Sequence, residues 1–212
     1  MSTEPFRQLV GVAAPLMRPN IDTDAIIPSR EMKRVSKKGL GEGLFAEERY
    51  LDVAARTPNP DFVLNREEYR DCSILLADAN FGCGSSREHA VWALREYGIR
   101  AIIAPSFGSI FANNCVRNGL LPLRLDERLV RELSDWVQRE PARHRLHIDL
   151  EMQRVRAGEM DVPFAIDSGA RHMLLNGLDA IALTQTRWEQ IEAFHNARRL
   201  ARPWLYRDCA GP

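Results

Sequence analysis

The segment 80–89 carries more groups suited to chemistry than any other stretch of the chain, and it reads NFGCGSSREH. Gly82 and Gly84 permit positive φ angles and let a ligand approach the backbone closely. The segment lies between a predicted buried strand and a predicted helix, whose first N–H groups have no partner within the helix. Such a helix N-terminus binds carboxylate or phosphate, and Arg87 adds a guanidinium for the same anion. The segment therefore predicts a binding site for an anionic ligand.

The same residues also fit a structural interpretation. Ser85 and Glu88 have the spacing of a capping box, in which the serine caps the helix and the glutamate bonds back. The two interpretations are compatible, because Ser86 could cap the helix while Ser85 points outward. Cys83 fits a small residue in a tight turn better than a nucleophile, and His89 fits a structural helix residue better than a base.

Two further segments could contribute to such a site. Residues 20–28 read NIDTDAIIP, and their two acids could bind a metal ion, although an Asx-turn is the favoured interpretation. Residues 105–114 begin another helix directly after another predicted buried strand. In a parallel sheet both helix N-termini would lie at the carboxyl ends of the strands, where ligands collect.

Several familiar motifs are absent from the sequence. Gly82 and Gly84 lack the remaining glycine of a dinucleotide fingerprint, and no P-loop Lys-Ser/Thr pair follows them. The residues around Ser85 do not form the Gly-x-Ser-x-Gly elbow of serine hydrolases. The cysteines share no iron–sulfur ligand spacing and form no CxxC pair; they are Cys72, Cys83, Cys115 and Cys209. We therefore expect reduced thiols and no metal bound by this chain.

Alternating strands and helices must position these segments. Apolar runs bounded by turn residues predict strands at 9–14, 73–77 and 101–104. Helical periodicity predicts helices at 88–97, 106–118 and 127–140. The order strand, turn, helix, strand indicates a βαβ unit with parallel strands. After Pro141 the pattern predicts two or three antiparallel strands, and then an amphipathic segment that closes the fold, around Trp188, Ile191 and Phe194.

Residues 29–70 follow no such pattern. They are rich in Lys, Arg, Glu, Gly and Pro, which indicates a long, mobile, functional insertion. Within it, we expect residues 29–45 to become ordered only with substrate and a partner protein. We expect a single domain over residues 1–212, with this insertion and a C-terminal helical tail from about residue 186.

The composition is that of an ordinary globular protein, with 45% apolar and 27% charged residues among 212. Lys plus Arg and Asp plus Glu each number 29, so the chain has no net charge to attract nucleic acid or anionic lipid. The longest stretch without charged residues, 101–116, is shorter than a membrane span and contains Pro105. The N-terminus makes a poor signal peptide. We therefore expect a cytoplasmic protein that binds neither nucleic acid nor membrane.

The three chemistry-bearing segments together closely resemble the small subunits of 3-isopropylmalate dehydratases, in the aconitase superfamily. The run GCGSSREHA at 82–90 is the most specific part of this resemblance. It extends over nearly the whole chain and includes 20–28, 58–65, 103–107, 118–122 and 176–179.

The resemblance implies an α/β fold, namely the swivelling β/β/α domain that corresponds to the mobile last domain of aconitase. It implies a separate large subunit that holds a 4Fe–4S cluster, in a heterodimer or larger assembly, and a reaction that removes water from a hydroxy diacid and adds it back at the neighbouring carbon. It gives the role of catalytic base to Ser85 and that of substrate carboxylate binding to Ser86 and Arg87. It places Asp24 in the network that binds the substrate.

One departure from the family pattern concerns the substrate. The family usually has Arg-Thr-Gly in the loop after Pro28, whereas this chain reads SKKG at 36–39. A lysine is a point charge and does not reproduce an arginine fork, so Lys37 would hold the same substrate carboxylate with weaker geometry. The alternative is a paralogue that acts on citramalate, dimethylmalate or a related substituted malate.

Three other classes of function are weaker alternatives. A non-catalytic anion-binding domain is disfavoured because Ser85, Arg87 and Asp24 are all retained. An RNA-binding role is disfavoured by the zero net charge and the lack of an aromatic-basic stripe. A stand-alone serine hydrolase is the most distant alternative.

Overall fold

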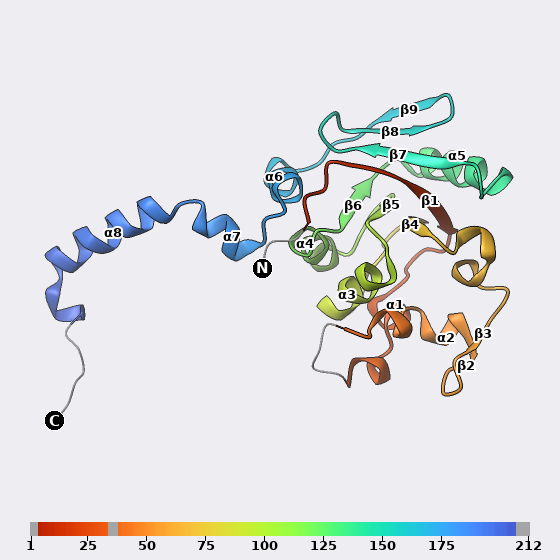
Figure 1. Ribbon diagram of the computed structural model, residues 1–212, viewed down its shortest axis with the longest axis horizontal. Coiled ribbons are helices and arrows are strands. Elements are labelled where there is room, and N and C mark those ends of the chain that lie inside the picture. The colour runs from red at the N-terminus through yellow and green to blue at the C-terminus, as the bar shows by residue number, and fades with distance from the viewer. Residues whose placement is uncertain (1–3, 34–37, 207–212) are drawn as a thin grey trace.

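The computed structural model describes residues 4–33 and 38–206. Its main sheet has seven strands in the order β6–β5–β4–β1–β7–β8–β9 (Figure 1). The seven strands are β1 (Gln8–Leu16), β4 (Cys72–Ala77), β5 (Ala101–Ala104), β6 (Leu121–Arg124), β7 (Arg145–Asp149), β8 (Arg154–Ala157) and β9 (Met160–Pro163). A small second sheet pairs β2 (Tyr50–Asp52) with β3 (Thr57–Pro58).

Strand β1 joins a parallel half of the main sheet to an antiparallel half. On one side β1, β4, β5 and β6 run parallel, and on the other β7, β8 and β9 continue antiparallel. The predicted parallel unit and the antiparallel strands after Pro141 are therefore confirmed. Strand β6 was not predicted, because Pro122 lacks an N–H donor and is tolerated in a strand mainly at a sheet edge, where β6 lies.

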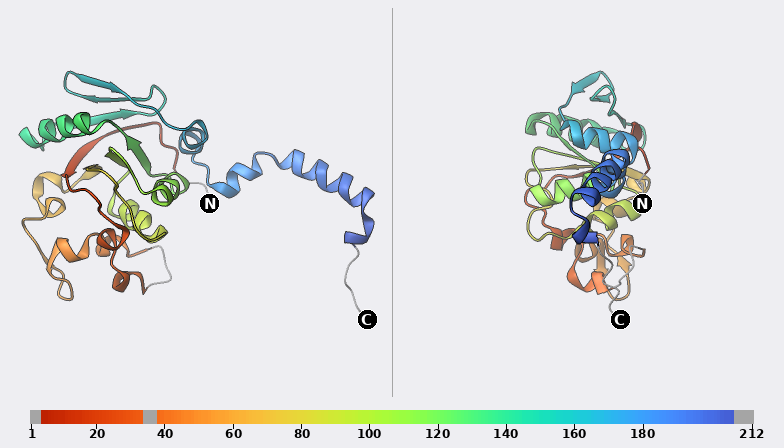
Figure 2. Two further views of the ribbon diagram at one scale, coloured as in Figure 1. Left: turned by 180° about the vertical axis from the view of Figure 1, so that it is seen from behind. Right: turned by 90° about the vertical axis from the view of Figure 1, so that its left-hand side faces the viewer.

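Both halves of the sheet are covered by helices that match the predicted ones. These are α3 (Glu88–Tyr97), α4 (Ser109–Arg117) and α5 (Glu127–Arg139), with α6 (Ser168–Asn176) following the antiparallel strands. Helices α3 and α4 pack against each other, while α5 lies across the sheet from them (Figures 1 and 2). Helix α5 buries Val130, Leu133 and Val137, and it packs against β1, β4 and β5.

The central parallel strands form the core on which the loops at their ends are built. Every residue of β5 is fully buried, as are the last four residues of β4. Strands buried on both faces read as continuous apolar runs, which is why the sequence predicts them well.

Residues 38–70 pack onto this core through short elements with no sequence periodicity. They include α2 (Ala46–Arg49) and single 3₁₀ turns at Gly41–Gly43, Val63–Asn65 and Glu67–Tyr69. Leu40, Leu44, Phe45, Phe62 and Leu64 are buried, and the rings of Phe45 and Phe62 lie 5.8 Å apart. The expected mobility of residues 29–45 without a partner stays a prediction.

The C-terminal segment forms α7 (Ala180–Gln185) and α8 (Trp188–Ala201), which extend away from the sheet (Figures 1 and 2). The expectation that this segment closes the fold is wrong, since neither helix has a buried residue. The spacing of Trp188, Ile191 and Phe194 does indicate one apolar face. Among residues 4–33 and 38–206, the last one in the buried core is Leu174 of α6, so this apolar face contributes no residue to the core. Within the described residues, no helix combines the length and apolarity that a membrane span requires.

Candidate active site

The turn that follows β4 is joined to two other segments by backbone hydrogen bonds. Gly82 N donates to Ile21 O at 2.7 Å, Phe81 N donates to Ser106 O at 3.1 Å, and Gly108 N donates to Phe81 O at 2.9 Å. The three segments singled out in the sequence therefore lie side by side. They follow β1, β4 and β5, so the site is at the carboxyl edge of the parallel half-sheet.

This close approach depends on two glycines. Gly82 has φ 70°, and a Cβ there would lie 2.2 Å from the ring of Phe111. A Cβ at Gly108 would lie 2.4 Å from the carbonyl oxygen of Gly82. Larger residues at either position would force the segments apart, and with them the side chains that they carry.

The short helix α1 (Thr23–Ile26) fixes the second segment to this turn. The side chain of Asp22 caps α1 by accepting from Ala25 N at 2.7 Å, which agrees with the turn interpretation of this acid. Thr23 N donates to Cys83 O at 3.0 Å, and Thr23 Oγ1 donates to Ser85 O at 3.0 Å. The backbone at Ser85 is thus held from α1.

Helix α3 begins at the site without a side-chain cap. Its N-cap residue is Arg87, whose side chain makes no capping hydrogen bond. Glu88 accepts instead from Asn118 Nδ2 at 2.7 Å, so the capping-box interpretation is wrong. Ser85 and Ser86 remain exposed beside the helix N-terminus. His89 packs its ring 4.8 Å from that of Trp92, as a structural helix residue would.

Asp24 and Arg87 form an ion pair across the two segments, 63 residues apart in the chain. The side chains are 52% and 21% exposed, so the pair is accessible to a ligand. Asp24 orients the guanidinium next to the N-terminus of α3, where the helix dipole favours negative charge. This arrangement can bind a carboxylate and stabilise negative charge on a nearby oxygen.

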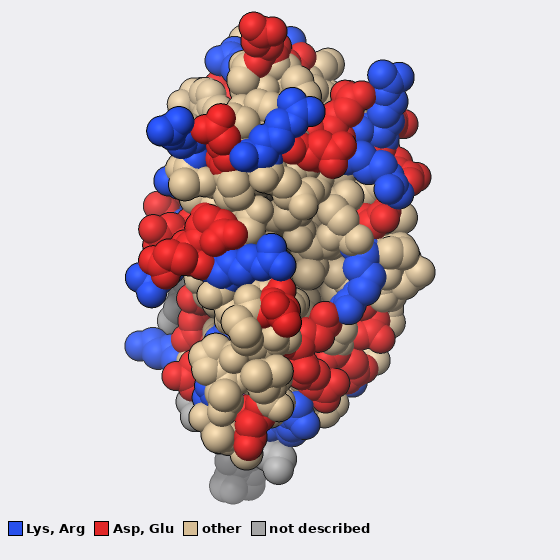
Figure 3. Space-filling model, turned by 90° about the vertical axis from the view of Figure 1, so that its right-hand side faces the viewer, with Lys and Arg blue, Asp and Glu red and all other residues tan. Residues whose placement is uncertain are grey.

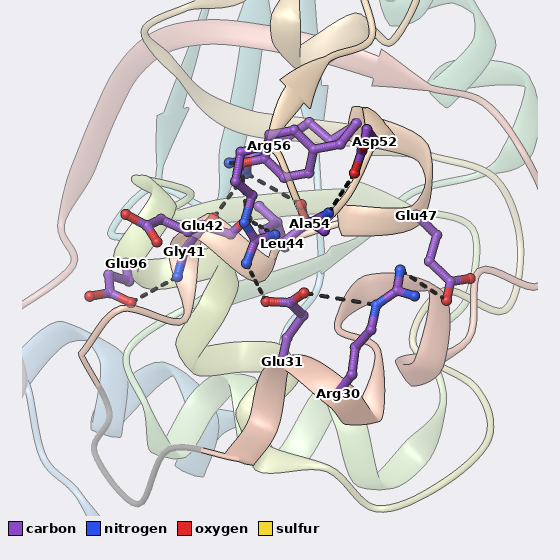
Figure 4. A network of polar contacts seen from close by, with 12 residues as sticks. Arg30, Glu31, Gly41, Glu42, Leu44, Glu47, Asp52, Ala54, Arg56 and Glu96 are labelled. Atoms are coloured by element: carbon purple, nitrogen blue, oxygen red, sulfur yellow. Dashed lines mark hydrogen bonds and ion pairs between the residues drawn. The ribbon is translucent and has the colours of Figure 1, made fainter.

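A hollow of about 500 Å³ adjoins this ion pair, and Arg30 lines it together with Asp24, Ser29 and Glu47. One Arg30 nitrogen lies 3.4 Å from Glu47 and another lies 3.9 Å from Glu31, as Figure 4 shows. Sequence reasoning missed Arg30, because it belongs to the region without a pattern. Its position beside the site follows only from the fold.

A polar network braces residues 38–49 against α3 (Figure 4). Glu96 accepts from Gly39 N at 2.6 Å and from Gly41 N at 2.8 Å. The buried Arg49 donates to Gly41 O at 2.9 Å, and its guanidinium lies 5.2 Å from the centre of the Tyr97 ring. These contacts join residues 38–49 to the last turn of α3, the helix whose first turn lies at the site. Lys37, the remaining predicted site residue, lies outside the residues that the structure describes.

Two of the three thiols in the described part of the chain, Cys72 and Cys115, are buried and unsuited to cluster ligation, and the third, Cys83, is half-buried. Burial raises the pKa of Cys72 to about 12, and burial also raises the pKa of Cys115. Metal-bound cysteine is a thiolate, so both residues would have to ionise inside the core. Among the described residues, no three His, Cys, Asp or Glu side chains are grouped so that they could hold a metal ion. These donors do not fit a 4Fe–4S cluster.

The half-parallel sheet, with a candidate anion site at its carboxyl edge, fits a domain of the aconitase type. A family model described as the aconitase C-terminal domain matches residues 3–128, and the chain belongs to this family. The predicted α/β fold and family are confirmed.

Within the family, the chain is similar over nearly its whole length to small subunits of 3-isopropylmalate dehydratase. It is 58% identical to the one from Cupriavidus necator over 97% of this chain and 99% of that protein. It is 51% identical to the one from Methylibium petroleiphilum, over 95% and 97% of the two chains. A crystal structure of 3-isopropylmalate dehydratase from Methanocaldococcus jannaschii matches with a TM-score of 0.64 at 25% identity, over 88% of this chain and 99% of that one.

Proposed function

We propose that this chain is the small subunit of a hydro-lyase that isomerises 2-isopropylmalate to 3-isopropylmalate in leucine biosynthesis. The observation that carries the proposal is the Asp24–Arg87 pair beside Ser85 at the uncapped N-terminus of α3. It stands in a chain whose relatives at 58% and 51% identity are named small subunits of this enzyme. A small subunit requires a large subunit, which we propose as the partner in a heterodimer or larger assembly.

We propose that Ser85 acts as the catalytic base. A serine hydroxyl is a poor base unless its alkoxide is stabilised, and the N-terminus of α3 together with Arg87 supplies positive potential for that purpose. The proton removed from the carbon next to the departing hydroxyl would pass to Ser85 Oγ, and return from it when water is added back at the neighbouring carbon. Ser86 and Arg87 would bind a substrate carboxylate, while Asp24 holds the guanidinium in place.

We assign the 4Fe–4S cluster to the large subunit, since the described cysteines of this chain do not fit one. The steps proposed for this chain involve only its own residues. Because the substrate carries two carboxylates, a second cation is needed, and Lys37 is proposed for that role. A single domain over residues 1–212 and a cytoplasmic location without nucleic-acid or membrane partners belong to the same proposal.

A paralogous dehydratase acting on citramalate or dimethylmalate is the second candidate. The observation that favours it is the lysine pair at 37–38 where the family usually has Arg-Thr. Since Lys37 keeps the positive charge of the arginine and only the geometry of the fork changes there, we place isopropylmalate first.

The test is anaerobic reconstitution with the large subunit, followed by turnover of 2-isopropylmalate, citramalate and dimethylmalate. We expect isopropylmalate to be preferred, no turnover by this chain alone, and a loss of at least about 10²-fold in kcat for Ser85→Ala. The control is Ser168→Ala, at the start of α6 away from the site, which should keep the wild-type kcat. Turnover by the isolated chain, or a fully active Ser85→Ala enzyme, would contradict the proposal.

A further inference from the structure

The tail formed by α7, α8 and the following turn, residues 180–206, exposes large apolar side chains on isolated helices. Trp188 is 61% exposed, Phe194 is 59% exposed and Leu200 is 85% exposed. Helix α8 has only 14 residues, and an isolated helix of roughly 12–15 residues is marginally stable in water. Packing against another surface would stabilise the helix and bury its apolar side chains. The described body does not provide that surface.

One continuous face of the tail is suited to such a covering surface. A hollow of about 540 Å³ is lined by residues that include Leu183, Ile191 and Phe194. A second hollow of about 440 Å³ adjoins it along α8 and is lined by Phe194, Ala197 and Ala201 among others. Phe194 belongs to both, and along α8 Ile191, Phe194, Ala197 and Ala201 lie three or four residues apart, on one side of the helix. We name the residues lining these two hollows the tail face.

The charged residues of the tail face all have the same sign. Arg187, Arg198 and Arg202 line the two hollows, and none of the described lining residues is acidic. By contrast, the end of the body away from the tail shows basic and acidic side chains intermingled (Figure 3). The tail face therefore suits a partner with an apolar surface bordered by carboxylates.

A second copy of this chain is a poor partner for the tail face. In an antiparallel pair of tails centred near Phe194, Arg187 of one copy would face Arg202 of the other. No carboxylate of the tail face is available to separate these guanidinium groups, and like charges opposed across an interface are destabilising. The charge pattern therefore favours a different protein.

We propose that the tail face docks onto the large subunit of the enzyme, against an apolar surface bordered by acidic residues. This inference rests on the proposed function, which makes this chain a small subunit. The Cupriavidus necator small subunit aligns with 97% of this chain, so the alignment includes the tail, whereas the aconitase domain model ends at residue 128.

The test compares substitutions on and off the tail face in the full chain, mixed anaerobically with its large subunit. Phe194→Asp lies on the face, and its matched control Leu200→Asp lies on α8 outside both hollows. Arg198→Glu and its neighbour Arg199→Glu form a second pair. We expect the dissociation constant, measured by sedimentation, to rise at least about tenfold for each on-face variant and to stay within about twofold for each control. At saturating large subunit, kcat should remain that of the wild type, because the tail contributes nothing to the site.

The outcomes separate this inference from the proposed function. Equal binding by Phe194→Asp and Leu200→Asp overturns the docking proposal, and wild-type turnover of isopropylmalate would still support the function. A wild-type complex that forms through the tail face but turns over none of the three malates overturns the function and keeps the docking. If Phe194→Asp abolishes self-association of the isolated chain and leaves binding to the large subunit unchanged, the tail face belongs to a second copy and our proposal is wrong.

Discussion

The active-site edge and the C-terminal tail are held in opposite ways. At the site edge, backbone groups of three chain segments bond to one another, and neither Gly82 nor Gly108 has room for a Cβ. In α7 and α8 no residue is buried, and side chains such as Phe194 face solvent. The site edge is therefore held together by contacts within this chain, whereas the tail obtains its packing from another protein in our proposal.

This difference corresponds to two tasks of a subunit, which are binding a ligand and associating with another protein. Binding a carboxylate, the task that we propose for this edge, demands groups fixed to within a fraction of an ångström, and the backbone hydrogen bonds and the Asp24–Arg87 pair hold such groups in place. Association demands exposed apolar surface, which would be a liability in a chain that acts alone. Substitutions in the two regions should accordingly differ in what they damage.

Gly82→Ala should cause the largest loss of stability, and it would force apart the chain segments that meet at the site edge. The new methyl group overlaps the Phe111 ring, and the residue must keep φ 70°, so we expect a loss of about 3 kcal/mol or more in the free energy of unfolding. The matched control is Gly84→Ala. At Gly84 φ is 87°, but the nearest atom to the new Cβ is 3.4 Å away. We therefore expect a loss of about 1–2 kcal/mol in the free energy of unfolding from the positive φ alone. Urea unfolding of the isolated chain measures both, and equal losses would show that the close approach is not what requires glycine.

Alkaline pH should lower the free energy of unfolding of the body. The presence or absence of the tail should not change this effect. Burial raises the pKa of Cys72 from 9.0 to about 12, and burial raises that of Cys115 as well. The unfolded thiols lose their protons first, so the unfolded state binds fewer protons and stability falls as pH rises above 9. By pH 10 we expect a loss of roughly 1.4 kcal/mol in the free energy of unfolding from Cys72, and a further loss in the same direction from Cys115. Cys72→Ala should reduce the fall in the free energy of unfolding above pH 9. A chain that lacks the tail should show the same change of free energy with pH as the full chain.

Arg87→Lys should damage substrate binding without damaging the fold. Lysine keeps the charge but loses the fork, so we expect KM to rise about 10- to 100-fold with little change in thermal unfolding. Arg18→Lys is the matched control, since Arg18 also forms an ion pair with a carboxylate, with two hydrogen bonds to Glu48 at 2.7 and 2.8 Å. An unchanged KM for Arg87→Lys, or an equal rise for both variants, would argue against carboxylate binding by Arg87.

Deleting residues 187–212 should have the smallest effect on the isolated chain. No described residue of α8 is buried, so little apolar surface is lost and we expect the melting temperature to change by less than about 1 °C. The same deletion should weaken binding to the large subunit. A drop of several degrees in the isolated chain would show that the tail packs on the body, and the contrast between the two regions would then fail.

The parts of the fold with strong local signals were predictable from the sequence. The buried runs at 73–77 and 101–104 became β4 and β5, and the periodic segments became α3, α4 and α5. Residues 38–70 were not predictable, because their order comes from distant partners such as Glu96, which binds Gly39 and Gly41 more than 50 residues away. A pattern within a short window carries no information about such contacts.

The candidate site likewise has residues that were predictable from the sequence and residues that were not. The segment around Ser85 and Arg87 was recognisable from local residue types, and the location of Asp24 beside Arg87 follows once the strands are parallel. Arg30 could not be found, because nothing near it in the sequence marks it as a residue of the site. The outward course of α8 was also missed, since a helix with one apolar face has the same pattern whether it packs on its own body or on another protein.

The position of β1 in the sheet affects how the chain folds during synthesis. Strand β1 leaves the ribosome before the other six strands of this sheet, and both halves of the sheet meet on it. Its Gln8 pairs with Asp149, 141 residues further along the chain. The parallel half can assemble once residues 72–124 are available, but β1 keeps an open edge until β7 has been made. Pairings over such long sequence separations form slowly, and an unpaired strand edge is prone to associate with other chains. Nascent chains that end before residue 145 should therefore be the forms of this protein that depend most on chaperones.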